Sequence, residues 1–372
     1  MTALDPIEHW DNFLEDWGGS LAGLRASLLT WYSQAKRDLP WRENHDPYRI
    51  WVSEIMLQQT RVETVIPYFH RFLERFPTVQ ALADAPLDDV LAQWSGLGYY
   101  RRARHLHKAA QEIRDRHEGN FPSSLEEVLA LSGIGRYTAG AILSIAFGQE
   151  VPLVDGNVFR ILSRLFHLTS PLHSTPLTKQ SWKIAEALVT GEEPGDFNQS
   201  LMELGALICA PSRPTCLFCP VREHCKAHEL GVQETLPTPK VKKTKVKDVG
   251  LSWAFVRKDG QWLMQKRPAE GLFAGMWDFP GVVAGRGKKP PAFKSLKKLL
   301  KEWGAEIQWQ DSPHSFEHLL SHRRLHIHVY VGKWEGGELS LDSPWQWVGS
   351  EEMQALGCSS IVRKIANTLD NL

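Results

Sequence analysis

The stretch Leu131-Ser-Gly-Ile-Gly-Arg-Tyr-Thr-Ala-Gly140 decides the fold of the larger part of this chain. A capping box that begins at Ser124 predicts a helix before this stretch, and an apolar segment predicts a second helix after it. The glycines Gly133 and Gly135 allow a tight hinge whose backbone N–H groups point outward, where the dipole of the second helix favours an anion. We therefore predict a helix–hairpin–helix over about 124–147, a sequence-independent holder of phosphate; an ordinary helix connection is the alternative.

On both sides of the hairpin, the spacing of apolar residues and the local composition divide the chain into regions. Apolar residues recur at helical spacing over 24–228, which predicts an all-α region. Residues 229–249 are rich in lysine and contain prolines, which is a linker composition. Residues 250–372 run in strand-like segments with one helical segment between them and predict a smaller α+β domain. Residues 1–23 form an N-terminal extension with no assigned role.

Composition narrows the class of protein. The 372 residues are 42% hydrophobic, and the 43 basic and 43 acidic side chains give no net charge, which excludes a disordered chain. No apolar run approaches the roughly 18 residues of a membrane span, and the acidic N-terminus lacks the order of a signal peptide. We expect an intracellular, cytoplasmic protein with no membrane partner. Nucleic acid is not excluded, because local clusters of Lys and Arg matter more than the net charge.

Four of the five cysteines crowd into a short segment. Cys209, Cys216, Cys219 and Cys225 have the spacing C-x6-C-x2-C-x5-C, and only Cys358 lies apart. Four thiolates can close around an iron–sulfur cluster or a tetrahedral zinc ion. Structural zinc sites usually pair two C-x2-C knuckles, and this segment has one. Four unrelated buried thiols are the remaining alternative.

Two carboxylates stand in contexts that suggest acid–base chemistry. On a helix, Glu54 shares a face with Ile50, Trp51 and Leu57, so desolvation should raise its pKa and keep it a proton donor near neutral pH. Asp155 is most simply a turn residue and helix N-cap. Cleavage of a glycosidic bond needs such a pair, with one acid for the leaving group and one carboxylate facing the oxocarbenium ion.

The segment Trp94-Ser-Gly-Leu-Gly-Tyr-Tyr-Arg-Arg102 combines glycines, aromatic residues and arginines. Glycines let a loop approach a duplex closely, an aromatic tip can wedge into the base stack, and arginines can hold phosphates. An aromatic turn that covers the core is the alternative.

Together these motifs resemble the adenine DNA glycosylases called MutY, a family of the helix–hairpin–helix glycosylase superfamily. The resemblance extends over about residues 24–370. In chain order, the matching segments are Leu39-Pro-Trp41, Ser53-Glu-Ile-Met-Leu-Gln-Gln-Thr60, Gly96-Leu-Gly-Tyr-Tyr100, the hairpin, Val154-Asp-Gly-Asn157 and the cysteine spacing.

The resemblance implies a monofunctional DNA N-glycosylase of base excision repair. Such an enzyme removes adenine mispaired with 8-oxoguanine or guanine in double-stranded DNA, and we expect a monomer. It implies that Glu54 protonates adenine N7, that Asp155 stabilises the sugar cation, and that Tyr137 and Asn157 support this chemistry. It makes the four cysteines of 209–225 the ligands of a 4Fe–4S cluster. The positions implied to contact DNA are Gln59, Leu97, Tyr99, Gly133, Gly135, Ser321 and His322.

Three alternatives lead to different functions. A bifunctional glycosylase/lyase resembling endonuclease III would need a lysine where this chain has Tyr137, because a phenol cannot form an imine. Residues 250–372 resemble a Nudix domain, but the segment Lys297–Gly304 keeps one glutamate of the metal-binding set and has lysines at the other acidic positions, where they would repel the metal. We therefore expect a lesion-recognition module, in which Leu320-Ser-His322 replaces a family Phe-Ser-His segment, rather than a nucleotide pyrophosphatase. A non-catalytic DNA-binding protein would use Glu54 for affinity only.

Overall fold

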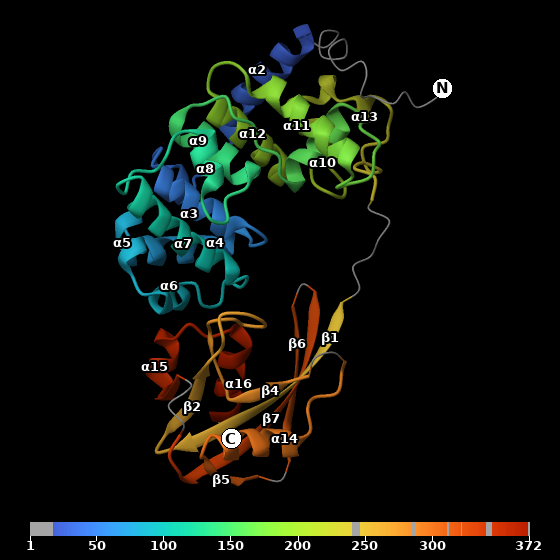
Figure 1. Ribbon diagram of the computed structural model, residues 1–372. Coiled ribbons are helices and arrows are strands. Elements are labelled where there is room, and N and C mark those ends of the chain that lie inside the picture. Colours follow the sequence, from blue (N-terminus) through green and yellow to red (C-terminus); the bar gives the residue numbers. More distant parts are fainter. Residues whose placement is uncertain are drawn as a thin grey trace. The chain divides into compact units, whose positions relative to one another are not determined.

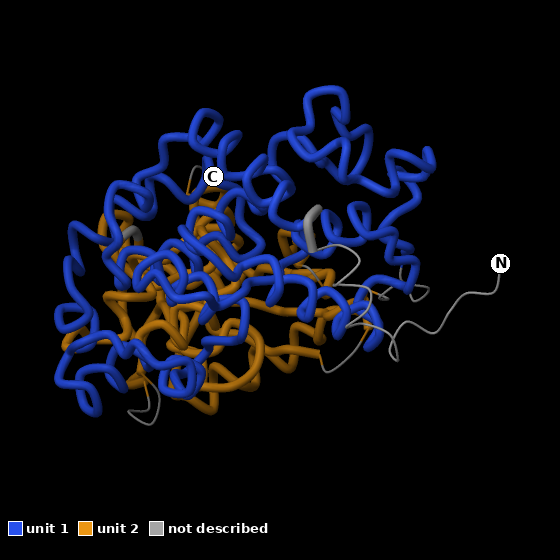
Figure 2. The backbone as a smooth tube through the Cα atoms, turned by 90° about the horizontal axis from the view of Figure 1, so that it is seen from above, with its two compact units in different colours: residues 1–83, 108–242 blue, residues 84–107, 243–372 orange. Residues whose placement is uncertain are grey.

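The computed structural model describes residues 18–239, 246–284, 287–310, 312–320, 322–339 and 344–370. The chain divides into two compact units, one of residues 1–83 with 108–242 and the other of residues 84–107 with 243–372 (Figure 2). No helix in the described ranges has the length and apolar character needed to cross a membrane.

The first unit is helical (Figure 1), which confirms the predicted all-α fold class. Its core is built around α10, with apolar residues of α2, α11 and α12 packed against it. The helices are α2 (Gly18–Ala35), α3 (Pro47–Leu57), α4 (Val62–Arg75), α5 (Val79–Asp84), the C-terminal part of α7 (Arg101–Arg116), α8 (Leu125–Ala130), α9 (Arg136–Phe147), α10 (Gly156–Leu165), α11 (Thr175–Val189), α12 (Pro194–Leu207) and α13 (Lys226–Glu229), with 3-10 turns η1 (Pro40–Arg42), η2 (Cys216–Phe218) and η3 (Arg222–His224).

The second unit is an α+β domain, as predicted, to which α6 (Leu87–Gln93) and the start of α7 also belong. Its strands form one mixed sheet of order β3-β2-β1-β7-β5, in which β4 pairs with β1, β6 with β7 and β8 with β2. The strands are β1 (Lys247–Lys258), β2 (Gln261–Lys266), β3 (Trp277–Asp278), β4 (Gly281–Val283), β5 (Glu306–Trp309), β6 (His314–Leu319), β7 (Arg323–Gly336) and β8 (Trp345–Val348), and the helices are α14 (Phe293–Glu302), α15 (Ser350–Ala355) and α16 (Ser360–Asp370).

The period of two along β1 explains why this sheet carries helices on both faces. Trp253 and Phe255 belong to one buried cluster together with residues of α16, whereas Ala254 and Val256 belong to a second cluster together with residues of α14. β1 and β7 run parallel from Lys247 opposite Arg323 onward and form the centre of the sheet.

The helix ends that position the candidate site follow the sequence signals, with one correction. Asp46 followed by Pro47, a helix cap with proline at the first helical position, predicts a helix through Thr60; α3 does begin at Pro47 behind Asp46, but it ends at Leu57. The backbone leaves the helix at Gln58, whose ψ of 111° is not helical, and Gln59 then has a left-handed backbone with φ of 58°. α8 is capped by Ser124, and α9 ends at Phe147, both as predicted.

Candidate active site

Glu54 lies on α3, where its side chain is only 5% exposed. Burial raises the pKa of Glu54 to about 7, and the negative charge of Asp155 acts in the same direction. The Tyr137 hydroxyl donates a hydrogen bond of 2.7 Å to Oε2 of Glu54, and this bond, like the charge of Arg42, acts to lower the pKa. The raised pKa that the apolar helix face predicts is therefore present, and Glu54 can keep its proton near neutral pH.

Asp155 is the N-cap of α10 and is half-buried. Its Oδ1 accepts a hydrogen bond of 2.7 Å from Val158 N, and its Oδ2 accepts one of 3.0 Å from Asn157 Nδ2. Burial raises the pKa of Asp155, whereas these donors act to lower it. The simple N-cap interpretation is thus correct, and the same bonds hold the carboxylate in one orientation.

Asn157 is held in turn by a buried arginine. Its Oδ1 accepts a hydrogen bond of 2.9 Å from Arg160 Nη2, which also donates to Gly205 O at 2.9 Å. Arg160 Nε donates to Cys209 O at 2.8 Å. Because the carbonyl side of the Asn157 amide faces Arg160, its NH2 group is free to face Asp155.

One pocket of about 670 Å³ brings the candidate residues of the first unit together, a volume ordinary for a small-molecule site. Gly133 has a φ of 81° in the hairpin, a conformation that favours glycine, and Gly135 is the N-cap of α9. The predicted residues that line the pocket are Glu54, Gln59, Gly133, Gly135, Tyr137, Asp155 and Asn157.

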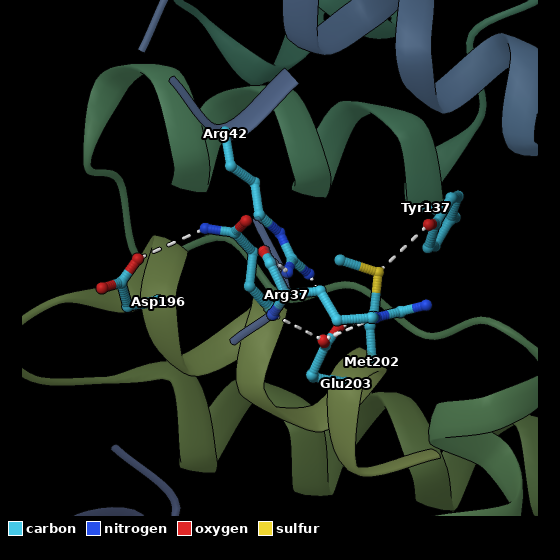
Figure 3. A network of polar contacts seen from close by, with 7 residues as sticks. Arg37, Arg42, Tyr137, Asp196, Met202 and Glu203 are labelled. Carbon is cyan, nitrogen blue, oxygen red and sulfur yellow. Dashed lines mark hydrogen bonds and ion pairs between the residues drawn. The ribbon is translucent and has the colours of Figure 1, made fainter. Parts of the chain in front are cut away.

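The same pocket has an ion-pair network that the sequence analysis missed (Figure 3). The buried carboxylate of Glu203 accepts hydrogen bonds from Arg37 at 2.7 and 3.0 Å and from Arg42 at 2.9 Å. Burial alone would raise the pKa of Glu203, but the two arginines outweigh it and lower the pKa to about 2. Its signal in the sequence was a lone acid between Leu201 and Leu204, the kind of context that singled out Glu54.

All four clustered cysteines line one cavity, together with Arg164. Arg164 Nη1 donates to Cys209 Sγ at 3.2 Å. Burial raises the pKa of Cys219 to about 12 and also raises the pKa of Cys216 and of Cys225, and the charge of neighbouring thiolates adds to each effect. In the described ranges, no group of three or more His, Cys, Asp or Glu side chains is arranged to hold a metal ion. Thiols that line one cavity and whose ionisation is disfavoured at Cys216, Cys219 and Cys225 fit a cationic metal centre, because its positive charge would favour the thiolate form.

The remaining predicted residues lie in the second unit. Tyr99 has a left-handed backbone with φ of 49° and is 41% exposed, whereas Leu97 is only 6% exposed. His322 is exposed, and its carbonyl oxygen accepts a hydrogen bond of 3.0 Å from Lys247 N. The prediction for Ser321 lies outside the described residues.

Two family models match this chain, one in its helical part and one in its C-terminal part. Residues 52–187 match the family model described as HhH-GPD superfamily base excision DNA repair protein, and residues 252–368 match that of the NUDIX domain. The chain is 35% identical over 402 residues to the adenine DNA glycosylase of Homo sapiens, an alignment that covers 93% of this chain and 73% of that protein.

A plant relative and one solved structure extend the comparison. The chain is 35% identical over 400 residues to the adenine DNA glycosylase of Arabidopsis thaliana, covering 92% of this chain and 63% of that protein. A solved thermostable thymine-DNA glycosylase is 28% identical with a TM-score of 0.51, covering 57% of this chain and 98% of its own.

Proposed function

Because this chain belongs to the family of adenine DNA glycosylases, we propose that it removes adenine mispaired with 8-oxoguanine or guanine from double-stranded DNA. The observation that carries the proposal is the pairing of a buried acid, Glu54 with a pKa of about 7, and a fixed carboxylate, Asp155, in one pocket. Hydrolysis of an N-glycosidic bond needs these two groups, because one must protonate the base and the other must face a cation.

The first step is protonation of the adenine. The base must leave the stack to reach the pocket, which costs a few kcal/mol. Tyr137 donates to Oε2 of Glu54, so the second carboxyl oxygen, Oε1, is left to carry the proton that passes to adenine N7. Burial also raises the pKa of Tyr137, so its hydroxyl keeps its proton and remains a donor throughout.

The second step is bond cleavage and capture of water. As the bond from the sugar C1′ to adenine breaks, its electron pair moves into the protonated base and an oxocarbenium ion forms on the sugar. The Asp155 carboxylate, held by Val158 N and Asn157, faces this cation and stabilises it by charge. A water molecule then adds at C1′, and its proton returns to a carboxylate of the pair.

The arrangement disfavours a lyase of the endonuclease III type. Tyr137 lines the pocket where the bifunctional family would need its lysine, and a phenol cannot form an imine with the sugar aldehyde. We therefore expect borohydride to trap no protein–DNA adduct, whereas efficient trapping would favour the bifunctional alternative.

Contacts to duplex DNA are assigned to both units. In the first, the N–H groups of the hairpin around Gly133 and Gly135 would hold a phosphate, and Gln59 would lie beside the mispair. In the second, we assign Leu97 and Tyr99 to the strand opposite the target adenine, and Ser321 and His322 to recognition of the oxidised base. We propose that the protein acts as a monomer inside the cell.

We also propose a 4Fe–4S cluster held by Cys209, Cys216, Cys219 and Cys225. The four thiols line one cavity, and their segment has a single C-x2-C knuckle where structural zinc sites usually pair two, which favours an iron–sulfur cluster over zinc. When bound, the cluster would fix the fold of the cysteine loop, residues 209–225. The catalytic steps above do not involve the cluster.

The decisive test is single-turnover adenine release by the full-length protein. We expect release from duplexes with an A:8-oxoguanine or an A:G pair and none from an A:T duplex. Binding of these duplexes without release, by protein that contains its cluster, would instead identify a non-catalytic DNA-binding protein.

A further inference from the structure

The loop that carries Tyr99 is built from unusual backbone conformations. Gly96, Gly98 and Tyr99 have positive φ values of 96°, 76° and 49°. For a non-glycine residue such as Tyr99 this conformation is unfavourable and persists only where the surroundings determine it. Within the loop, Trp94 Nε1 and Arg102 Nη2 donate to Gly98 O at 3.2 and 3.1 Å.

Two further hydrogen bonds join the loop to a residue far along the chain. The Tyr100 hydroxyl accepts from Gly96 N at 3.1 Å and donates to the backbone carbonyl of Cys358 at 3.2 Å. Ser95 Oγ donates to the same carbonyl at 2.8 Å. A carbonyl oxygen can accept two hydrogen bonds, so Cys358 O joins both sides of the loop at one point.

Cys358 is itself fixed in the sheet. It forms a parallel bridge with Trp277 of β3, whose N donates to Gly357 O at 3.1 Å. The Cys358 side chain is fully buried in the core against α16, and burial raises the pKa of its thiol to about 12. The thiol is therefore a neutral core group, and the backbone of this residue is what the loop uses.

Neighbouring contacts keep the two segments together. Helix α6, which leads into the loop, packs against α15. A Cβ atom added at Gly357 would lie 2.8 Å from Leu91 Cβ, which shows how closely the two backbones approach. Lys266 Nζ forms an ion pair of 2.6 Å with Asp88.

We propose that the C-terminal part of the chain positions Tyr99, with the carbonyl of Cys358 as the anchor and Ser95 and Tyr100 as positioning residues. This proposal rests on the proposed function, in which Tyr99 inserts beside the base opposite adenine. The C-terminal domain then contributes to lesion recognition from a distance, through the conformation of the loop, in addition to any direct contact it makes with the oxidised base.

The test uses the full-length protein and weakens the contact between the loop and Cys358 O by substitutions in the loop and beside Cys358. Ser95→Ala removes one donor to Cys358 O, and Gly357→Ala pushes the anchor away from α6 without touching the loop. Tyr100→Phe removes its bonds to both Gly96 and Cys358. Ser33→Ala is the matched control, because its hydroxyl also donates to a backbone carbonyl, Thr30 O, at 2.8 Å.

The readout is the fluorescence of 2-aminopurine placed beside 8-oxoguanine, which rises when an inserted side chain unstacks it, together with adenine release from A:8-oxoguanine and A:G duplexes. We expect each anchor variant to weaken the insertion signal and the preference for A:8-oxoguanine roughly 2- to 10-fold, as for one lost hydrogen bond. Ser33→Ala should match the unaltered protein. In a Tyr99→Ala background the anchor variants should have no further effect, because they act through Tyr99.

Two results would overturn the proposal. In one, Ser95→Ala and Gly357→Ala match the unaltered protein while Tyr100→Phe alone is defective, which means that the loop only closes on itself. In the other, the anchor variants are equally harmful in the Tyr99→Ala background. Failure of the unaltered protein to release adenine would overturn the proposed function instead. Ser95→Ala keeps the test valid if Gly357→Ala does not fold.

Discussion

Replacing Glu54 by glutamine keeps the shape of the side chain but removes its acidic proton. We expect adenine release to fall by a factor on the order of 100 or more, while the affinity for the duplex stays nearly unchanged. In the unaltered protein, release should decline as the pH rises through about 7, the pKa to which burial raises Glu54. Single-turnover rates over a pH series, with a binding titration for each protein, check both statements; a variant as fast as the unaltered protein would remove Glu54 from the mechanism.

Tyr137→Phe tests the hydrogen bond to Glu54 separately. This bond acts to lower the pKa of Glu54, so its loss should raise that pKa and move the alkaline limb of the pH–rate profile to higher pH. A limb that moves to lower pH would show that the bond stabilises the protonated form instead.

The same raised pKa affects stability. Glu54 has its ordinary pKa of 4.5 in the unfolded chain and a pKa of about 7 in the folded one. Protonated Glu54 gives the folded protein its full stability below pH 4.5, the pKa in the unfolded chain. This contribution is lost as the pH rises to about 7, the pKa in the folded protein. From about pH 5 to about pH 8, Glu54→Gln should therefore gain up to about 3 kcal/mol of unfolding free energy relative to the unaltered protein. Urea unfolding at both pH values measures this, and a pH-independent difference would contradict it.

Residue-scale inference from the sequence succeeded where the signal was local. Apolar neighbours on one helix turn predicted the raised pKa of Glu54, and the chemistry of a helix start predicted Asp155 as a cap. The pairing of Glu203 with Arg37 and Arg42 could not be predicted, because the partners are separated by more than 160 residues and meet only in the folded chain.

At the scale of elements, the helix–hairpin–helix and most helix ends could be predicted, because capping residues and glycines act over one turn. The end of α3 could not: nothing in Gln58-Gln59 marks a helix stop, yet Gln59 adopts a left-handed backbone and lines the pocket. Such an ending is locally unfavourable, but it brings the Gln59 side chain to the pocket.

The prediction at this scale concerns the metal bound by the cysteine loop. Anaerobically purified protein should be brown and contain about four irons per chain. Metal analysis with a visible spectrum checks this, and one zinc with no iron would show a structural zinc site. Cys358→Ser is the matched control, because this buried thiol lies outside the loop and its replacement should leave the iron content unchanged.

At the scale of the whole molecule, the grouping of residues 84–107 with the C-terminal part was beyond the sequence. The apolar residues Val90 and Leu91 predict that α6 buries one face, but they do not tell which distant segment covers it. The α+β character of that segment was predictable, because period-two alternation is a local property of each strand.

Truncation after residue 232 tests both units at once. It keeps Glu54, Asp155 and the four clustered cysteines, so adenine release should persist. The preference for A:8-oxoguanine over A:G should fall by about 1–3 kcal/mol, and backbone amides of 84–107 should exchange faster once their partner is gone. Single-turnover assays measure the substrate preference, and hydrogen exchange measures the amides of 84–107, with α10 as the internal reference. If neither the preference nor the exchange rates change, lesion recognition lies wholly in the helical region.

Because the second unit is built from two separate segments, the two units become able to fold at different times during translation. Residues 84–107 leave the ribosome before residues 243–372 exist, whereas the first unit lacks nothing once residue 242 has emerged. At roughly 5–20 residues per second, translation of the remaining part takes on the order of ten seconds. During that interval the pocket can assemble, but the face of α6 that packs against α15 stays uncovered. A nascent chain can therefore complete the pocket that contains Glu54 and Asp155 before the loop that carries Tyr99 meets the carbonyl of Cys358.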